Sequence, residues 1–294
     1  MFLTMLRTKL LLFGFIIISG YAVSQKPVKA YDFYNSKGEA VSFDQVLTTS
    51  LQSDVVFIGE YHNCPIMHWF EIKLLKHIHQ STKKKVILGM EMFESDNQLL
   101  LDEYLTNTIN QKNFEDEVKL WPNYKTDYKP MVEYCKQNEI RIVATNIPRR
   151  YAAKVNRSGF EVLDSLSSEA KQYIAPMPID FDPELPSYKA MTFMGMGENK
   201  HLTHIVKAQA IKDATMAYFI HKHWQPNSIF VHINGSFHSD NREGIAWYLM
   251  KYNNKLKLTV ISIQNISDWN KINEIDFSKA DFTLVVDEDM TKTY

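Results

Sequence analysis

The sequence predicts an α/β protein, with a mostly parallel β-sheet flanked by helices and an inserted helical subdomain. Short apolar runs recur along the chain and are continuous rather than alternating, which is typical of strands buried on both faces. Helical patterns stand between these runs, and strands that alternate with helices favour parallel pairing through right-handed crossovers. One connection, from Arg150 to Asn227, is far longer than a crossover requires.

The first 24 residues are expected to be a cleaved signal peptide. Two basic residues, Arg7 and Lys9, precede the apolar run Leu10–Ser19, and a small-residue cleavage pattern ends at Ser24. The uncharged stretch is shorter than the roughly 20 residues that a membrane-spanning helix needs. We therefore expect export to the periplasm or the cell surface, with residues 25–294 forming the α/β domain. No cysteine lies near the cleavage site, so a lipid anchor is not expected, whereas peripheral membrane association stays open.

The alternation of predicted strands and helices begins near residue 55. Helices are expected at Met67–His79, Tyr128–Gln137 and Arg242–Tyr252, each next to an apolar run. The strand candidates, in chain order, are Val55–Gly59, Val86–Met90, Ile140–Thr145, Ile229–Ile233, Leu256–Ile263 and Phe282–Val286.

The long connection, at about residues 150–227, is expected to form a helical subdomain over one edge of the sheet. It holds short helical pieces at Gly159–Tyr173 and a long helix from about Leu202 to Trp224. Gln209 falls inside the apolar stripe of that helix and Asp213 lies at its margin. They are either tolerated polar residues or hydrogen-bond partners that face a site. The stripe consists of Ile205, Ala208, Met216, Phe219 and Ile220.

Charge and cysteine content exclude some classes of function. With 33 basic and 34 acidic residues the formal net charge is −1, so the chain lacks the electrostatic attraction expected of a nucleic-acid binder. The two cysteines, Cys64 and Cys135, would have the chance to bridge in an oxidising compartment, but a fold of this size does not need a disulfide. A catalytic thiol at Cys64 is not expected.

Polar side chains follow four of the predicted strands. The carboxyl edge of a parallel sheet is where ligands bind, because the loops diverge there and leave a crevice. The four strand ends therefore predict one site at this edge. The residues that the strands deliver are, in chain order, Glu60 with His62, then Glu91, then Asn146 with Arg149 and Arg150, and finally His238 after Asn234-Gly235.

Two carboxylates and two imidazoles in one crevice have two chemical uses. Glu60, His62, Glu91 and His238 are suitable ligands for a divalent metal. Alternatively, one histidine acts as a general base that a carboxylate orients, which makes all four catalytic candidates. Glu91 stands among apolar neighbours and would be costly to bury without a partner. The remaining histidines considered, namely His68, His77, His79, His201, His204, His221 and His223, are expected to be ordinary surface or core residues.

The segments around these residues also resemble a known family. GEYHNCPIMHWFE, GMEMF, YKPMVEYCKQNEIRIVATNIPRR, VKAQAIKDATMA and NGSFHSDNREGIAWYL together resemble the ChaN-like haem-binding uptake family of the Tiki superfamily, over roughly Val55 to Leu249. The resemblance implies a parallel sheet with flanking helices and a smaller helical subdomain. It also implies an exported protein of iron acquisition that binds haem through a tyrosine and dimerises.

The resemblance leaves the haem ligand and the activity open. Tyr151 is the candidate for the iron ligand, because Arg149 and Arg150 beside it would lower the pKa of its phenol and pair with haem propionates; Asn146 would complete that haem-binding set. Rival ligands are Met194, Met196, His201 and His204. The first hypothesis is thus a haem-binding uptake protein. The second is a hydrolase, since the superfamily includes metal-dependent proteases and erythromycin-esterase-like enzymes that use the positions of Glu60, His62, Glu91 and His238.

Overall fold

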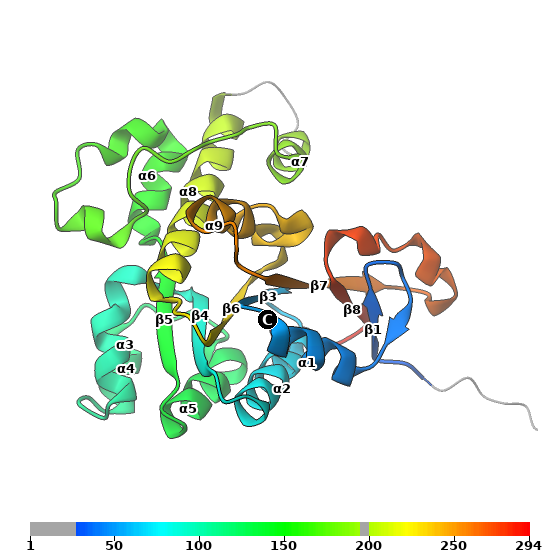
Figure 1. Cartoon of the computed structure of the whole chain (residues 1–294). Helices are drawn as coiled ribbons and strands as arrows, with labels where there is room; N and C mark the ends of the chain where they lie inside the picture. The colour runs from blue at the N-terminus through cyan, green and yellow to red at the C-terminus, as the bar shows by residue number, and fades with distance from the viewer. Residues whose placement is uncertain (1–27, 195–199) are drawn as a thin grey trace, which may run out of the picture.

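A twisted eight-stranded sheet with helices on both faces forms the centre of the computed structural model, which describes residues 28–194 and 200–294 (Figure 1). The predicted signal peptide therefore lies outside the described residues. The strands are β1 (Tyr31–Asn35), β2 (Ala40–Val41), β3 (Val55–Glu60), β4 (Lys85–Glu94), β5 (Arg141–Asn146), β6 (Ser228–Gly235), β7 (Leu258–Ile266) and β8 (Phe282–Asp287). The α-helices are α1 (Phe43–Gln52), α2 (Pro65–Ser81), α3 (Gln98–Leu105), α4 (Gln111–Glu117), α5 (Lys129–Gln137), α6 (Arg149–Ser158), α7 (Pro186–Met194), α8 (Lys200–His223) and α9 (Ile245–Tyr252).

The sheet is mostly parallel, as predicted. Its strand order is β2-β1-β8-β7-β3-β6-β4-β5, and every neighbouring pair from β8 to β5 is parallel. All six predicted strands are present. The two strands that the sequence did not reveal, β1 and β2, pair antiparallel at one edge. They are short and only partly buried, so they lack the continuous apolar run on which the prediction depended.

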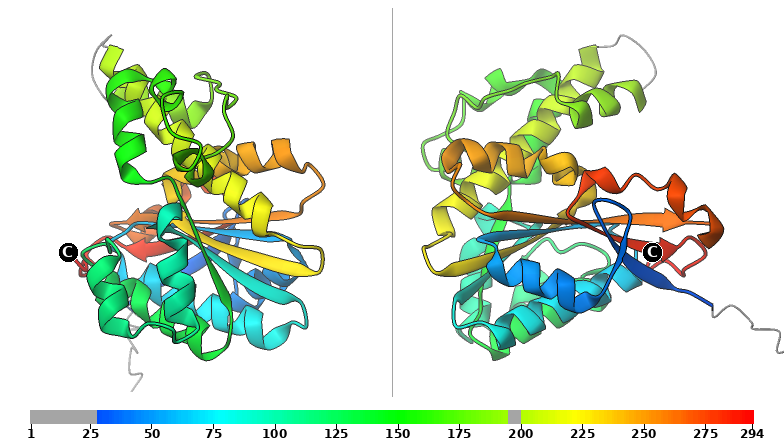
Figure 2. Two further views of the ribbon diagram at one scale, coloured as in Figure 1. Left: turned by 90° about the vertical axis from the view of Figure 1, so that its left-hand side faces the viewer. Right: turned by 45° about the vertical axis from the view of Figure 1, so that its right-hand side comes forward.

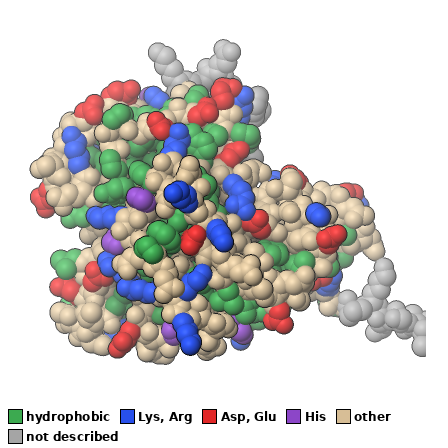
Figure 3. All heavy atoms as spheres, viewed as in Figure 1, with side chains coloured by type: hydrophobic (Ala, Val, Ile, Leu, Met, Phe, Trp, Pro, Cys, Tyr) green, Lys and Arg blue, Asp and Glu red, His purple; other side chains and the backbone are tan. Residues whose placement is uncertain are grey.

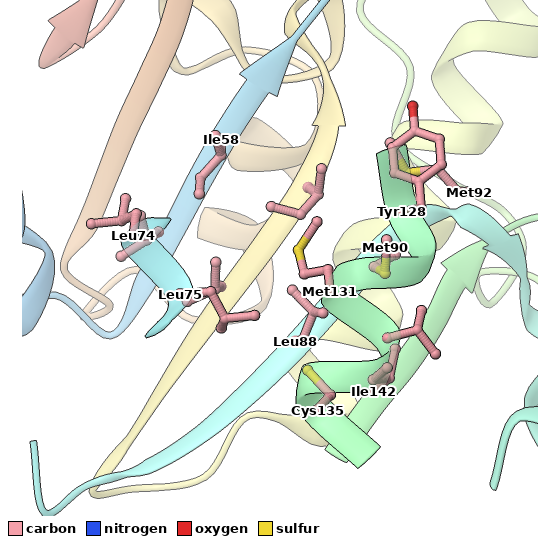
Figure 4. Close-up of a cluster of buried hydrophobic side chains, with 14 of the residues drawn as sticks. Ile58, Leu74, Leu75, Leu88, Met90, Met92, Tyr128, Met131, Cys135 and Ile142 are labelled. Atoms are coloured by element: carbon pink, nitrogen blue, oxygen red, sulfur yellow. The ribbon is translucent and has the colours of Figure 1, made fainter. Parts of the chain in front are cut away.

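Alternate residues of each central strand face opposite layers of helices. Val56 and Ile58 of β3 belong to the larger core cluster, whereas Val55 and Phe57 belong to the cluster on the other face. Figure 4 shows side chains from the strands packed with those of α2 and α5 in the larger cluster. Burial on both faces explains why the strands read as continuous apolar runs rather than as alternating ones.

The long connection is helical, and α6 and α8 rise beyond the sheet (Figure 2). The first part of α8 packs with α6 through Ala208 and Ile211, and its second part packs on the sheet through residues such as Met216 and Ile220. Ile205 was expected in the buried stripe but is 38% exposed, because it lines a surface cavity. The short pieces predicted at Gly159–Tyr173 are 3-10 turns, η3 (Phe160–Leu163) and η4 (Ala170–Tyr173).

The surface carries charges of both signs, interspersed on the face that Figure 3 shows. Of the helices that the structure describes, none combines the length and hydrophobicity needed to cross a membrane. Cys64 and Cys135 are both free and fully buried. The core therefore holds them as small apolar side chains.

Candidate functional site

The carboxyl ends of the central strands meet, as the sequence predicts. In the parallel pair of β3 and β6, Glu60 is level with Gly235. Glu91 reaches the same point from β4, where its Oε2 accepts a hydrogen bond of 2.7 Å from the backbone N–H of Gly235. A Cβ on Gly235 would lie 2.9 Å from Nε2 of His62 and 3.6 Å from Oε2 of Glu91. Only a residue without a side chain therefore lets these groups converge.

Glu60 is a buried carboxylate that orients His62. Its Oε1 lies 2.6 Å from Nδ1 of His62 and accepts a hydrogen bond of 2.6 Å from the Tyr128 hydroxyl. Burial opposes the charge of Glu60, but the neighbouring imidazoles of His62 and His68 outweigh it and lower the pKa of Glu60 to about 2. In the neutral ring an ionised Glu60 makes Nδ1 the protonated nitrogen of His62 and leaves Nε2 as the acceptor. Burial opposes a charged ring, but Glu60 and Glu91 outweigh it and raise the pKa of His62.

His238 lies between two buried carboxylates. Its Nε2 is 3.2 Å from Oε1 of Glu91, and its Nδ1 contacts Oδ1 of Asp213 on α8. Burial alone would favour a neutral ring, but the charges of Glu91 and Asp213 prevail and raise the pKa of His238 to about 10. His238 is thus an imidazolium at neutral pH, with both nitrogens committed as donors. Such a ring fits a charge-balancing role better than that of a metal ligand or a general base.

Of the two alternatives for Gln209 and Asp213, the structure shows the one in which they face the site. The side-chain amide of Gln209 lies 3.0 Å from Nδ1 of His238, and next to an imidazolium it is the amide oxygen that can accept a hydrogen bond. Asp213, which has no exposed surface, accepts a hydrogen bond of 2.8 Å from the hydroxyl of Tyr188 on α7. Helices α7 and α8 of the long connection therefore position His238 at the edge of the sheet.

Sequence reasoning missed two site residues on α2. His68 was expected to be an ordinary histidine, but it is buried beside Glu60, with its Nε2 3.6 Å from Oε2 of that residue. Glu71, one turn further along α2, is fully buried and lies beside Glu60 and His68. The sequence did contain a signal for them. Both residues fall in the helix stripe that faces the core, where buried polar side chains need hydrogen-bond or ligand partners; the apolar members of that stripe are Met67, Phe70, Leu74, Leu75 and Ile78.

A cavity of about 600 Å³ opens at this edge of the sheet. Its polar wall includes Glu60, His62 and His238, and its apolar wall includes Met191 and Phe237. Met191 and Gln209 also line a second cavity of about 290 Å³, which continues toward Arg149 and Lys212. The site is therefore a cleft with a histidine at one end and cations at the other.

Comparisons with known proteins agree with this fold. A family model described as haem-binding uptake, Tiki superfamily, ChaN, matches residues 46–249. The chain belongs to this family. ChaN of Campylobacter jejuni, at 18% identity, has the same fold with a TM-score of 0.68 over 88% of this chain and 97% of that one. A Bacillus cereus protein follows at 11% identity and a TM-score of 0.51, covering 88% of this chain and 95% of its own.

A plant protein is also related over part of its length. The RETICULATA-RELATED 5 protein of Arabidopsis thaliana, described as chloroplastic, is 23% identical over 186 residues, which is 58% of this chain. This chain spans only 25% of that protein's length.

The haem-binding set predicted for this ChaN family member is only partly assembled. Arg149 lines the second cavity, but its guanidinium is already paired with Glu94, and Arg150 is 2.6 Å from Asp96. The Tyr151 ring packs beneath the guanidinium of Arg150, 4.5 Å from it, and lines neither cavity. Each arginine is held by an acidic partner: Arg149 by Glu94, the last residue of β4, and Arg150 by Asp96, just beyond that strand.

Two of the other haem-binding candidates do not reach the cleft either, and the rest lie outside the described residues. The Asn146 amide donates to the backbone carbonyl of Glu91 at 3.0 Å, so it braces the strand ends. Nδ1 of His204 faces the carbonyl of Arg157. Met196 and the side chains of Met194 and His201 lie outside the described residues.

Proposed function

We propose that this protein binds haem in the cleft at the carboxyl edge of the sheet, as part of haem or iron uptake. Family membership supports the ligand class, and ChaN of Campylobacter jejuni is described as binding haem cofacially. The observation that carries the proposal is His62: its Nδ1 is held by the buried Glu60, so its Nε2 is the atom that would ligate iron from the cavity wall, in place of the proton that the raised pKa of the ring favours.

The walls of the cleft suit the two halves of a haem. A porphyrin is flat and apolar, and Met191 and the 53% exposed Phe237 offer an apolar wall beside His62. Its propionates carry negative charge, and the adjoining cavity offers the ammonium of Lys212, whereas Arg149 on the same wall is already paired with Glu94. Among the described residues no acidic side chain pairs with Lys212, so its ammonium is available to an anionic ligand. The size of the cleft lies within the usual range of ligand sites, about 300–1,000 Å³.

His62 is a better iron ligand here than the nearby tyrosines. Tyr61 and Tyr294 line the cavity, but burial raises the pKa of both phenols, and nearby acidic groups add to that rise. A tyrosine binds haem iron as the phenolate, so a raised pKa opposes that role. The proposal assigns the iron to His62 and leaves the tyrosines as wall residues.

Haemin titration of the purified chain tests the proposal. The wild type should give a saturable Soret shift at micromolar protein, and His62→Ala should weaken haemin binding at least about tenfold, or 1.4 kcal/mol. His77→Ala, on the exposed side of α2, is the matched control and should bind like the wild type. A wild type without a Soret shift would refute haem binding. Unchanged binding by His62→Ala would refute only the ligand assignment.

Export and self-association follow as parts of the same proposal. A haem-uptake protein works outside the cytoplasm, and the signal-like segment at residues 1–24 supports export. N-terminal sequencing of the protein recovered from a bacterial host tests cleavage near Ser24. Sedimentation of the chain with and without haemin tests whether haem joins two copies.

The hydrolase alternative has less support. His238, one of its candidate bases, has both ring nitrogens facing carboxylates. The family match concerns haem rather than hydrolysis. We therefore do not propose a hydrolytic activity.

A further inference from the structure

A second group of ligating side chains lies beneath the cleft. Glu60 at the end of β3 and His68 and Glu71 on α2 each bring one ligand atom within 4.8 Å of the others. We call these three residues the inner cluster. His68 and Glu71 are three positions apart on α2, so one helix face presents both to the end of the strand.

The inner cluster has unsatisfied polar atoms in a place without water access. Glu71 has no exposed surface, and neither of its carboxylate oxygens has a hydrogen-bond partner in the described part of the chain. Oε2 of Glu60 and both ring nitrogens of His68 also lack a hydrogen bond, and Nδ1 of His68 has only a charge contact, with Asp127. A buried carboxylate without partners costs several kcal/mol. Burial and the charge of Glu60 raise the pKa of Glu71, so without a cation a proton on Glu71 neutralises the pair, and a bound metal ion would take the place of that proton.

Asp127 gives the histidine an orientation suited to a metal. Its Oδ2 lies 3.3 Å from Nδ1 of His68, on the ring side opposite Glu60. Asn123, the residue before the π turn η2 (Tyr124–Tyr128), holds Asp127 within that turn by donating a hydrogen bond of 2.6 Å. A carboxylate at Nδ1 directs the lone pair of Nε2 toward the cluster, as outer carboxylates do for metal-bound histidines. Turns of this kind are frequent at functional sites.

From this geometry we propose that the inner cluster binds one divalent transition-metal ion, with Glu60, His68 and Glu71 as ligands and Asp127 as the residue that orients His68. Two carboxylates balance the two charges of the ion, and one imidazole with two carboxylates suits Zn²⁺ or Mn²⁺. The 3.6 Å between Nε2 of His68 and Oε2 of Glu60 is close to the roughly 3.4 Å between two ligands of a tetrahedral zinc ion.

This site is separate from the proposed haem ligand but adjacent to it. Glu60 is the shared residue: Oε1 faces His62 and Tyr128, and Oε2 faces the inner cluster. A metal held by Oε2 would fix the carboxylate that orients His62. His68 and Glu71, by contrast, do not line the cleft. Variants of these two residues therefore test the metal site without removing a group from the haem wall.

Metal analysis of the intact chain tests the proposal. The protein, purified without chelator or refolded with Zn²⁺ and then dialysed, should retain about one Zn²⁺ per chain. Glu71→Gln keeps the volume but removes a ligand charge, and it should lower the zinc content at least about tenfold. His68→Gln gives a second, independent loss if Glu71→Gln does not fold. His77→Gln is the control on the same helix and should keep the metal.

Thermal unfolding supplies a readout that does not depend on metal recovery. Zn²⁺ at 100 times its dissociation constant should raise the Tm of the wild type by roughly 5–10 °C and leave that of Glu71→Gln unchanged. Retained haemin binding in Glu71→Gln would show that the two sites fail or succeed separately. The proposal is overturned if refolded wild type holds no Zn²⁺ or Mn²⁺ after dialysis, or if Glu71→Gln and His68→Gln hold as much metal as His77→Gln.

Discussion

The charge of His238 makes the stability of the protein depend on alkaline pH. The imidazole is buried between Glu91 and Asp213, and these two charges raise its pKa from 6.5 to about 10. The folded protein therefore holds a proton that the unfolded chain releases above pH 6.5. The resulting stability is fully present below pH 6.5 and is lost as the pH rises through 10.

The magnitude follows from the two pKa values. At 1.36 kcal/mol per unit, His238 contributes about 4 kcal/mol to the free energy of unfolding at pH 7 and about 1 kcal/mol at pH 9.5. We expect the wild type to lose about 3 kcal/mol between these two pH values. Guanidinium unfolding followed by circular dichroism at pH 7 and pH 9.5 measures this difference directly.

Asp213→Asn provides the matched comparison. The asparagine keeps the shape and an oxygen for Nδ1 of His238, but it removes one of the two charges that hold the proton. We expect a loss of about 3 kcal/mol at pH 7, in the range of a broken buried ion pair, and a shallower dependence on alkaline pH. If the wild type is equally stable at pH 7 and pH 9.5, His238 is neutral in the folded protein and the reasoning fails.

Two glycines give further predictions. Gly235→Ala would place a methyl group 2.9 Å from Nε2 of His62, so the partly exposed ring should turn away. We expect haemin affinity to fall roughly tenfold while the midpoint of urea unfolding hardly changes. Unaltered haemin affinity would contradict the proposed ligand geometry. Gly89→Ala would place a methyl group 2.4 Å from Cε1 of Phe230 in the middle of the sheet, and we expect a destabilisation of about 2–3 kcal/mol in urea unfolding. A loss below about 1 kcal/mol would mean that the Phe230 ring can yield more than a packed core allows.

The fold was predictable because the central strands are buried on both faces. Their apolar runs are too short to cross a membrane as helices, and their order with intervening helices predicts parallel pairing. The edge strand β1 escaped prediction for the opposite reason: its burial is partial, and only pairing with β8 makes it a strand.

The site was predictable only at the level of the sheet edge. Glu60 and Glu91 lie in the carboxyl-terminal parts of β3 and β4, and His62 and His238 come just after β3 and β6, so parallel topology brings the four together. Arg149 and Arg150 follow a strand too, yet they pair with Glu94 at the end of β4 and with Asp96 just after it. Charge complementarity between segments about 55 positions apart decides that outcome, and a strand pattern does not encode it.

The amino-acid sequence by itself determined the sheet, its buried strands and the edge at which ionisable side chains gather, since those features depend on local periodicity and on the sharp ends of apolar runs. The tertiary structure alone decided which ionisable side chains pair with one another and which could bind the same metal ion. The long connection supplies Asp213 to His238, and α2 supplies His68 and Glu71 to Glu60. Electrostatic pairing acts over a few ångströms in space whatever the separation along the chain, so only the packed helices fix these partners.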